Sequence, residues 1–264
     1  MSRRQRHVVA IQGRLGNQLF QLAFGLWLAD RSGLEVAFDL SRLRGIAIDG
    51  PAPMRSWVSE QPIAADRRWP TPGGRLGSVG TWIRRVVGPG VVVVDDSPSG
   101  SVPDEPVPAW WIGYWQQERF AIQSRDRFRR WFDIGASRPD PVVRVHVRRG
   151  DFVGLGRTLP VGWYRRAVGQ AQAAVGVDRV EVVTDDRNWC SRELVPHIEG
   201  AEIAPLGDAA TDLARLARSA ALVASDSTYS WWAGFLGSPL VLVPAGASNL
   251  RELLRDGDRW IRST

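Results

Sequence analysis

The stretch "VRVHVRRGDF" (Val143–Phe152) decides the fold of the second half of this chain. Apolar and polar side chains alternate along it, as in a β-strand with two unlike faces: Val143, Val145 and Val147 against Arg144, His146 and Arg148. The chain then turns at Gly150, so two arginines and an aspartate lie together at the strand end. An edge strand with a charged outer face and an anion site both fit this pattern. Ligands of doubly wound sheets bind at such strand ends, which favours the anion site.

Strands and helices alternate regularly through the rest of this half. The expected strands are Val142–Val147, Val180–Thr184, Ala221–Ser225 and Leu240–Val243. The expected helices are Val161–Ala174, Thr211–Arg218, Tyr229–Leu236 and Asn249–Arg255. This order predicts an α/β fold with a mostly parallel sheet and helices on both of its faces.

The first half begins with a β–loop–α–β pattern. The strand His7–Gln12 leads through a glycine-containing loop into a helix, with Asn17 as the expected N-cap and Gly33 as its stop. The strand Leu34–Asp39 follows. Between residues 44 and 108 only Val91–Asp95 is a clear strand, and order resumes with a helix expected over Gln116–Phe132.

A linker-like segment, Gly135–Pro141, divides the two halves. We therefore expect an N-terminal domain over residues 1–140 and a C-terminal domain over residues 141–264.

Three further segments place polar residues at strand ends or helix starts. Asp185 and Asp186 follow a valine-rich strand, and the run Ser225–Thr228 follows another. Thr211 is the expected N-cap of a helix that carries Asp212 in its first turn. Each segment by itself is an ordinary helix cap. Together with Arg148 and Arg149 they favour a site for phosphate at the C-terminal edge of one sheet.

Composition limits the class of protein. The formal net charge is +6 and the chain contains no lysine, so every positive side chain is an arginine, the residue whose planar fork suits phosphate. Codon bias toward arginine explains the same count. The single cysteine, Cys190, excludes a disulfide within the chain. The basic N-terminus lacks the apolar run of a signal peptide, and no apolar run has the length of a membrane span, so we expect a cytoplasmic protein.

Several motifs occur in the order known from one family: "GRLGNQLFQLAFGLWLA", "GYWQQERF", "HVRRGD", "LPVGWYRRA", "TDDRNWC", "STYSWWAG" and "DRWIR". The chain resembles the bacterial alpha-1,2-fucosyltransferases, which use GDP-fucose. The H-x-R-R-x-D pattern is similar to a motif that these enzymes share with alpha-1,6-fucosyltransferases and protein O-fucosyltransferases. The resemblance covers most of the chain outside residues 44–108, and "GNQLFQ" with "STYSWW" narrows it to the alpha-1,2 group.

The resemblance implies a GT-B-like architecture, in which two Rossmann-like domains face a cleft and the C-terminal one binds the donor. Matched residue by residue, it implies that Arg148 holds the donor diphosphate, with Arg149 beside it important for activity. It also implies contacts to the donor from residues that match the family's binding positions: His146 to the nucleoside, Asp212 to guanine, Ser227 and Thr228 to phosphate, and the backbone of Gly16 and Asn17. Asp185, at a neighbouring strand end, is added to this donor-binding set. Asp226 departs from the family, where Asn is common at this position.

The implied reaction transfers L-fucose with inversion to a glycan hydroxyl, for which the family suggests the 2-hydroxyl of a terminal galactose. Arg148, Arg149 and Asp151 form the expected catalytic group. The general base stays open between Asp151 and Asp39. We expect no metal and no cofactor besides the donor, and we interpret the D-x-D sequence Asp256–Asp258 as a turn.

Other functions remain open at this stage. They include a transferase that uses another GDP-sugar or a protein acceptor, a non-catalytic binder of nucleotide sugars or glycans, and a glycoside hydrolase with a carboxylate pair. A nucleic-acid-binding protein is disfavoured because the arginines are scattered among acidic residues. The expected partners are therefore GDP-fucose and a glycan acceptor, with no transmembrane segment; peripheral contact with a membrane stays open.

Overall fold

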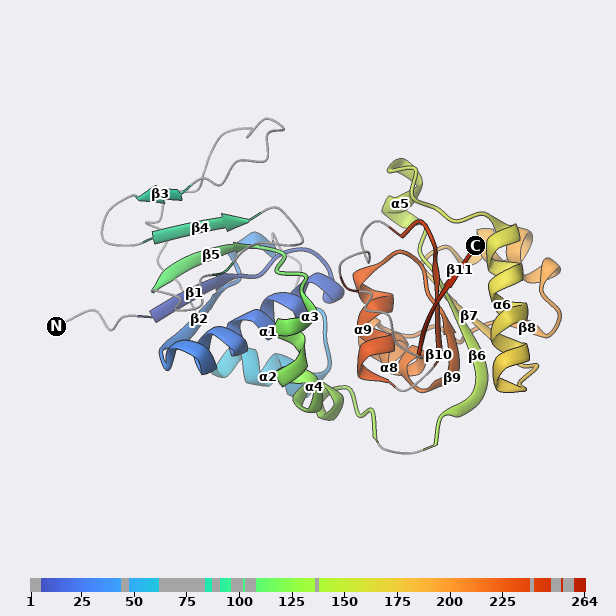
Figure 1. Ribbon diagram of the computed structural model, residues 1–264, viewed down its shortest axis with the longest axis horizontal. Helices are drawn as coiled ribbons and strands as arrows, with labels where there is room; N and C mark the ends of the chain where they lie inside the picture. The colour runs from blue at the N-terminus through green and yellow to red at the C-terminus, as the bar shows by residue number, and fades with distance from the viewer. Residues whose placement is uncertain are drawn as a thin grey trace. The chain divides into compact units, whose positions relative to one another are not determined.

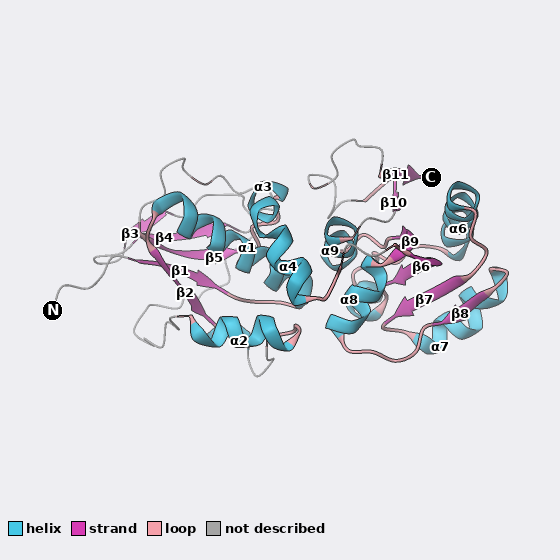
Figure 2. Cartoon of the chain, turned by 90° about the horizontal axis from the view of Figure 1, so that it is seen from below, coloured by secondary structure: helices cyan, strands magenta, loops and turns pink. Residues whose placement is uncertain are grey.

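The computed structural model describes residues 6–43, 48–61, 84–86, 91–95, 102, 108–135, 138–237, 240–247, 253 and 259–264. The chain forms two compact units, Met1–Ser124 and Arg125–Thr264. Each unit is built around its own sheet (Figures 1 and 2). The helix Asn249–Arg255 and the turn Asp256–Asp258, both expected from the sequence, lie outside the described residues, apart from Leu253.

The first unit contains a five-stranded sheet in the order β2-β1-β5-β4-β3, parallel except for the β3–β4 pair. Its strands are β1 (Arg6–Ala10), β2 (Glu35–Asp39), β3 (Arg84–Val86), β4 (Val91–Asp95) and β5 (Ala109–Gly113). Its helices are α1 (Leu15–Ser32), α2 (Ala52–Glu60) and α3 (Glu118–Ala121), with short 3₁₀ turns η1 (Ser41–Leu43) and η2 (Ile122–Ser124).

The long helix α1 begins earlier than the sequence suggested. Its N-cap is Arg14, whose side chain makes no capping bond, and Asn17 lies inside the first turn with its backbone N–H donated to the Arg14 carbonyl (2.9 Å). The expectation that Asn17 caps the helix is therefore wrong. The expected stop is confirmed, because Gly33 adopts the left-handed conformation (φ 66°) that glycine tolerates best.

The second unit contains a six-stranded parallel sheet in the order β11-β10-β9-β6-β7-β8. Its strands are β6 (Asp140–Val147), β7 (Val180–Thr184), β8 (Ala201–Ile203), β9 (Ser219–Val223), β10 (Leu240–Pro244) and β11 (Trp260–Ser263). Its helices are α4 (Arg125–Trp131), α5 (Gly150–Gly154), α6 (Val161–Val175), α7 (Arg187–Trp189), α8 (Ala209–Ala217) and α9 (Thr228–Leu236). A π-helical turn, η3 (Cys190–Leu194), and a 3₁₀ turn, η4 (Val195–His197), follow α7.

Helices lie on both faces of this sheet, as expected for the α/β class, with α6 on one face and α8 and α9 on the other (Figure 1). The valine face of β6 packs into the core beneath α6, together with Trp163 and Tyr164. The expectation of an α/β fold with a mostly parallel sheet is confirmed.

The two compact units divide between Ser124 and Arg125, whereas the sequence placed the domain boundary between residues 140 and 141. The helix expected over Gln116–Phe132 is broken into α3, η2 and α4, and α4 goes with the second unit. Arg125 Nε donates to the Phe235 carbonyl (2.9 Å), and Arg129 donates to the Leu236 carbonyl. These bonds satisfy carbonyls at the C-terminal end of α9, where a helix has no partners of its own.

The strand β6 is central, with β7 on one side and β9 on the other. The alternative of a charged edge strand is therefore wrong. Arg144 and His146 are both buried, each 6% exposed, so the polar face of β6 lies inside the unit. No helix in the described part of the chain is both long and apolar enough to cross a membrane.

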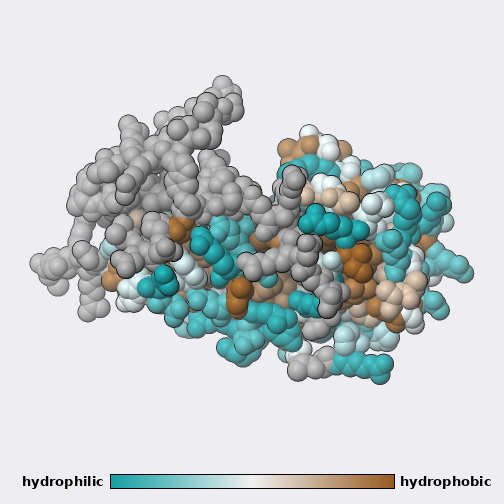
Figure 3. All heavy atoms as spheres, viewed as in Figure 1, coloured by the Kyte–Doolittle hydropathy of each residue, from teal (hydrophilic) through white to brown (hydrophobic). Residues whose placement is uncertain are grey.

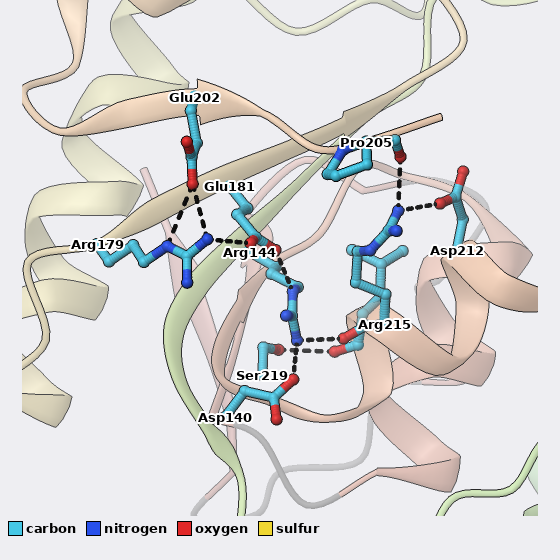
Figure 4. Close-up of polar contacts among 10 residues, drawn as sticks. Asp140, Arg144, Arg179, Glu181, Glu202, Pro205, Asp212, Arg215 and Ser219 are labelled. Carbon is cyan, nitrogen blue, oxygen red and sulfur yellow. Dashed lines mark hydrogen bonds and ion pairs between the residues drawn. The ribbon is translucent and has the colours of Figure 1, made fainter. Parts of the chain in front are cut away.

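Arg144 is the centre of a buried ionic network (Figure 4). Its Nε donates to Glu181 Oε2 on the neighbouring strand β7 (2.8 Å), and its Nη1 donates to Asp140 Oδ2 (2.8 Å) and to the Arg215 carbonyl (2.6 Å). Arg179, whose side chain is 61% exposed, closes the network at the surface by contacting Glu181 and Glu202.

We expect Arg144→Ala to lower the free energy of unfolding by about 3 kcal/mol, because it leaves the buried carboxylate of Glu181 with only the largely exposed Arg179 as its charged partner. Arg179→Ala is the matched control, since it removes an exposed arginine from the same network and should change stability little. Urea unfolding followed by circular dichroism measures both variants. Equal midpoints for the two variants would contradict a structural role for the buried pair.

Candidate functional site

The topology of the second sheet brings the polar strand ends together. The chain runs outward from β6 through β7 to β8, then returns to the other side of β6 to form β9, β10 and β11. The order therefore reverses between β6 and β9, and ligands of open α/β sheets bind outside the strand ends at such a point. The residues that follow these strands and β7 are Arg148, Arg149, Asp185, Asp186 and the run Ser225–Thr228.

Arg148 lies at the end of β6 between two carboxylates. Its Nη2 donates to Asp151 Oδ1 (2.6 Å), and its Nη1 lies 2.7 Å from Asp185 Oδ2. Gly150 permits this arrangement, because a Cβ atom on it would lie 2.7 Å from Asp185 Oδ2. Arg148 is thus an oriented, partly exposed side chain.

Both the side chain and the backbone of Arg149 are fixed by neighbouring residues. Its guanidinium lies over the Trp189 ring, 3.9 Å from the ring centroid, and its Nε donates to Asp186 Oδ2 (3.2 Å). Its backbone N–H donates to Asp185 Oδ1 (2.8 Å). Asp186 also caps α7 by accepting from the Trp189 backbone N–H (3.0 Å), so the expected capping role of this aspartate is confirmed.

The charges of this strand-end cluster are nearly balanced, with two arginines against Asp151, Asp185 and Asp186. The two carboxylate contacts of Arg148 occupy two of the five N–H donors of a guanidinium, which leaves donors for a further anion. An incoming diphosphate would therefore share Arg148 with Asp151 and Asp185. The role of Asp185 that this geometry supports is to orient Arg148 rather than to contact an anion directly.

His146 is buried beneath the cluster and contacts two serine hydroxyls. Its Nδ1 lies 2.5 Å from Ser230 Oγ and 2.9 Å from Ser225 Oγ, and its ring packs against Tyr229 with centroids 5.1 Å apart. Burial lowers the pKa of His146 to about 4, with Asp185 opposing that shift and Arg148 adding to it. His146 is therefore neutral near pH 7, and positive charge at this site comes from the arginines.

The segment after β9 forms the N-terminus of α9. Ser227 is the N-cap, and its hydroxyl accepts from the Tyr229 backbone N–H (3.3 Å). Thr228 is the first residue of the helix, and Asp226 beside it is 8% exposed. The structure therefore assigns Ser227 a capping role and places Thr228 at a helix end that favours anions.

Asp212 lies in the first turn of α8, as expected, but Thr211 does not cap this helix. The N-cap is Asp208, whose Oδ1 accepts from the Thr211 backbone N–H (2.7 Å). Tyr229 connects α9 to this helix, because its hydroxyl donates to the Ala209 carbonyl (2.6 Å). A chain of contacts thus leads from His146 through Tyr229 to the start of α8.

In the first unit, Gly16 and Asn17 lie in the first turn of α1. Gln116 Nε2 donates to Asn17 Oδ1 (3.0 Å), which ties this turn to the segment after β5. Asp39, a candidate general base, is 4% exposed at the end of β2 and accepts from the Ser41 backbone N–H (2.9 Å).

Within the described residues, no group of three or more His, Cys, Asp or Glu side chains could hold a metal ion. The D-x-D sequence Asp256–Asp258 lies outside those residues.

Apolar surface borders the charged strand end. Val153 and Leu155, in and just after α5, are 54% and 61% exposed. Apolar and weakly polar side chains gather over α5 in the space-filling view (Figure 3). Phe152, in the same helix, lies beneath the guanidinium of Arg148, 5.7 Å from Cζ to the ring centroid.

The sequence analysis did not identify several residues that shape this site. They are Trp189, Arg215, Tyr229 and Ser230. For Trp189 a signal existed, since it follows Asp186 by the three residues that a capping aspartate spans. The contact of Ser230 with His146 depends on the sheet order and has no local signal, whereas Arg215 follows Asp212 at the three-residue spacing of a helical ion pair.

Comparison with known proteins identifies the family. A model of glycosyl transferase family 11 matches residues 103–242, which include both arginines of the strand end and the start of α9. The chain belongs to glycosyl transferase family 11. The match excludes the N-terminal "GNQLFQ" segment.

Two curated relatives match part of this family 11 chain. An alpha-1,2-colitosyltransferase of Escherichia coli is 22% identical over 145 residues, which cover 47% of this chain and 50% of that protein. The mouse protein galactoside 2-alpha-L-fucosyltransferase Sec1 is 28% identical over 121 residues, which cover 41% of this chain and 32% of that protein. The chain thus spans half or less of the length of these relatives.

Solved structures resemble this family 11 member in fold. POFUT1 in complex with GDP aligns with a TM-score of 0.50 at 13% identity, over 90% of this chain and 98% of that chain. The fucosyltransferase NodZ from Bradyrhizobium aligns with a TM-score of 0.47 at 14% identity, over 89% and 94% of the two chains. The expected GT-B-like fold class is confirmed.

The buried neutral His146 predicts acid sensitivity. Its pKa is about 4 in the folded protein, below the 6.5 of an exposed histidine, so between these values the unfolded chain binds a proton that the folded chain does not. Stability should therefore fall as the pH drops from 6.5 to 4, by up to about 3 kcal/mol from this residue. Thermal unfolding across this range measures the slope. His146→Gln should give a shallower slope, and an unchanged slope would contradict the assignment.

Proposed function

We propose that this family 11 chain transfers L-fucose from GDP-fucose to a hydroxyl of an acceptor glycan, with inversion at the anomeric carbon. The observation that carries the proposal is the pair Arg148 and Arg149, oriented by carboxylates at the reversal point of a parallel sheet. Arginine is the side chain best suited to bind a diphosphate through several N–H donors.

The names of the two relatives support the finer assignment. One is an alpha-1,2-transferase and the other a galactoside 2-alpha-L-fucosyltransferase. We therefore take the 2-hydroxyl of a terminal galactose as the acceptor position. Transfer of colitose from its nucleotide-activated form is the second candidate function, because one of the two relatives is named as a colitosyltransferase.

The proposed chemistry is a single displacement. The acceptor oxygen bonds to the anomeric carbon as the bond from that carbon to the β-phosphate oxygen breaks. The bonding pair leaves with GDP, and the acceptor proton passes to a base. Negative charge grows on the β-phosphate, where preorganised donors such as Arg148 stabilise the transition state.

The general base stays a choice between Asp151 and Asp39. Asp151 is close to the proposed phosphate site, but Arg148 already holds its Oδ1. Asp39 receives the Ser41 backbone N–H on its Oδ1, so one of its two oxygens has a structural role. Both carboxylates keep a second oxygen that could accept a proton.

The decisive experiment incubates the protein with GDP-fucose and a panel of galactosides and reads the product linkage by NMR. Formation of an alpha-1,2-linked fucoside supports the proposal. Activity with GDP-colitose alone would favour the second candidate. Donor binding without transfer or slow hydrolysis would favour a non-catalytic binder.

Arg148→Ala should lower the turnover number at least about 100-fold, as expected for loss of a charge-stabilising donor in the transition state. Arg157→Ala is the control, because this exposed arginine lies near the same phenylalanine and has no proposed contact with phosphate. GDP release assayed at saturating donor measures the effect. Near-normal turnover of Arg148→Ala would contradict the proposed phosphate contact.

We also propose that the reaction needs no metal, because arginine supplies the charge that a divalent ion would otherwise supply. Excess EDTA should leave the rate within about twofold of the untreated rate. Loss of a catalytic metal would instead remove several kcal/mol of transition-state stabilisation and lower the rate far more. The control adds Mg²⁺ back after chelation. A loss in EDTA that Mg²⁺ restores would show that the metal-free mechanism is wrong.

A further inference from the structure

Arg215 connects the start of α8 to the loop before it (Figure 4). Its Nη1 donates to Asp212 Oδ1 (2.6 Å), one helical turn earlier, and to the Pro205 carbonyl (2.9 Å). Both charged side chains are mostly shielded, with 18% and 21% of their side-chain surfaces exposed. A partly shielded ion pair of this kind restricts the rotamer of the aspartate more than a surface pair does.

The backbone carbonyl of Arg215 is also hydrogen-bonded. The Arg215 carbonyl accepts from the buried Arg144, which Glu181 and Asp140 hold in turn. Ser219 Oγ donates to the Leu216 carbonyl in the same last turn of α8 (2.6 Å). The buried network on the sheet therefore sets the position of the helix from which Asp212 projects.

The Asp212 carboxylate packs against a glycine in the loop before α8. A Cβ atom on Gly207 would lie 2.7 Å from Asp212 Oδ1, so a larger residue there would displace the carboxylate. In the described part of the chain no hydrogen bond reaches Asp212 Oδ2. One oxygen is thus held by Arg215, while the other is available to a ligand.

The charges around Asp212 come from three helices. Burial raises the pKa of Asp212, and Arg215 opposes this shift most strongly. Asp208 on the same helix adds to the increase, and Arg187 at the start of α7 opposes it. Tyr229 of α9 also faces this group, and its own pKa is raised partly by Asp212. Arg215 is therefore the main group that keeps this half-buried carboxylate ionised.

We propose that Arg215 is a positioning residue for base selectivity: it holds Asp212 ionised and oriented to accept hydrogen bonds from guanine and not from adenine. The inference rests on the proposed function, in which Asp212 contacts the base of the donor. Guanine presents N1–H and a 2-amino group as adjacent donors, whereas adenine presents an N1 acceptor and has no 2-amino group. A fixed carboxylate thus attracts one base and repels the other.

The test measures binding of GDP and ADP to the full chain by calorimetry. Arg215→Ala should weaken GDP binding about tenfold and leave ADP binding unchanged, as expected when a hydrogen bond to a charged group is disturbed. Arg215→Lys keeps the charge and should recover part of the selectivity. Arg179→Ala is the matched control, since it removes an exposed arginine of the adjoining network that does not touch α8 and should keep the wild-type ratio.

The pH profile of GDP binding separates positioning from a general structural role. Base recognition requires the ionised carboxylate, so affinity falls as the pH is lowered through the pKa of Asp212. Without Arg215 that pKa is higher, and the fall should begin at a higher pH than in the wild type. Asp212→Asn should show no such fall, because it carries no titratable group.

The possible outcomes are distinguishable. If the wild type prefers GDP and Arg215→Ala keeps both that preference and the wild-type pH profile, the inference is overturned while the proposed donor class stands. Equal losses for GDP and ADP, with a melting temperature that falls, would indicate a structural role and would also overturn it. A wild type that does not distinguish GDP from ADP would overturn the inference together with the proposed donor.

Discussion

The buried ion pair between Arg144 of β6 and Glu181 of β7 underlies the organisation of the second unit. It joins two neighbouring strands on the face that α8 and α9 cover, and a further hydrogen bond from Arg144 to the Arg215 carbonyl positions the last turn of α8. Burying two charges is costly unless further hydrogen bonds satisfy them, and Asp140 and Arg179 supply those bonds. The same strand that carries this pair continues into Arg148 and Arg149. The stability of the sheet and the placement of the strand-end cluster are therefore linked through one strand.

In the proposed function, the strand-end cluster binds the donor diphosphate through oriented arginines rather than through an excess of positive charge. Three carboxylates surround Arg148 and Arg149, and a tryptophan ring supports the second arginine. The carboxylates lower the affinity of the cluster for anions in general, but they keep both guanidinium groups in place. Preorganised donors raise the rate because they stabilise the charge of the transition state without having to reorient during the reaction. His146 below them stays neutral because it is buried, so it contributes hydrogen bonding rather than charge.

Much of the fold could be predicted because its signals are local. The valine-rich strands, the stop at Gly33 and the capping by Asp186 depend on residues within a few positions of one another. The wrong predictions concern ends and edges. Arg14 rather than Asn17 begins α1, although its side chain makes no capping bond, and Asp208 rather than Thr211 caps α8, because the path of the loop decides where each helix begins. The boundary near α4 could not be predicted, because the partners of Arg125 and Arg129 at the end of α9 are more than 100 residues away.

The sequence by itself determined the α/β class, the family resemblance and the residues at the strand ends, because periodicity and motifs depend on residues that are close together in the chain. The tertiary structure decided what those residues do to one another. Alternation along β6 left an edge strand and an anion site equally consistent, and only the pairing with β7 and β9 placed Arg144 and His146 in the interior. The contacts of Arg148 with Asp185 and of Arg149 with Asp186 were likewise decided by the sheet order, because contacts between distant segments leave no periodic signal in the chain.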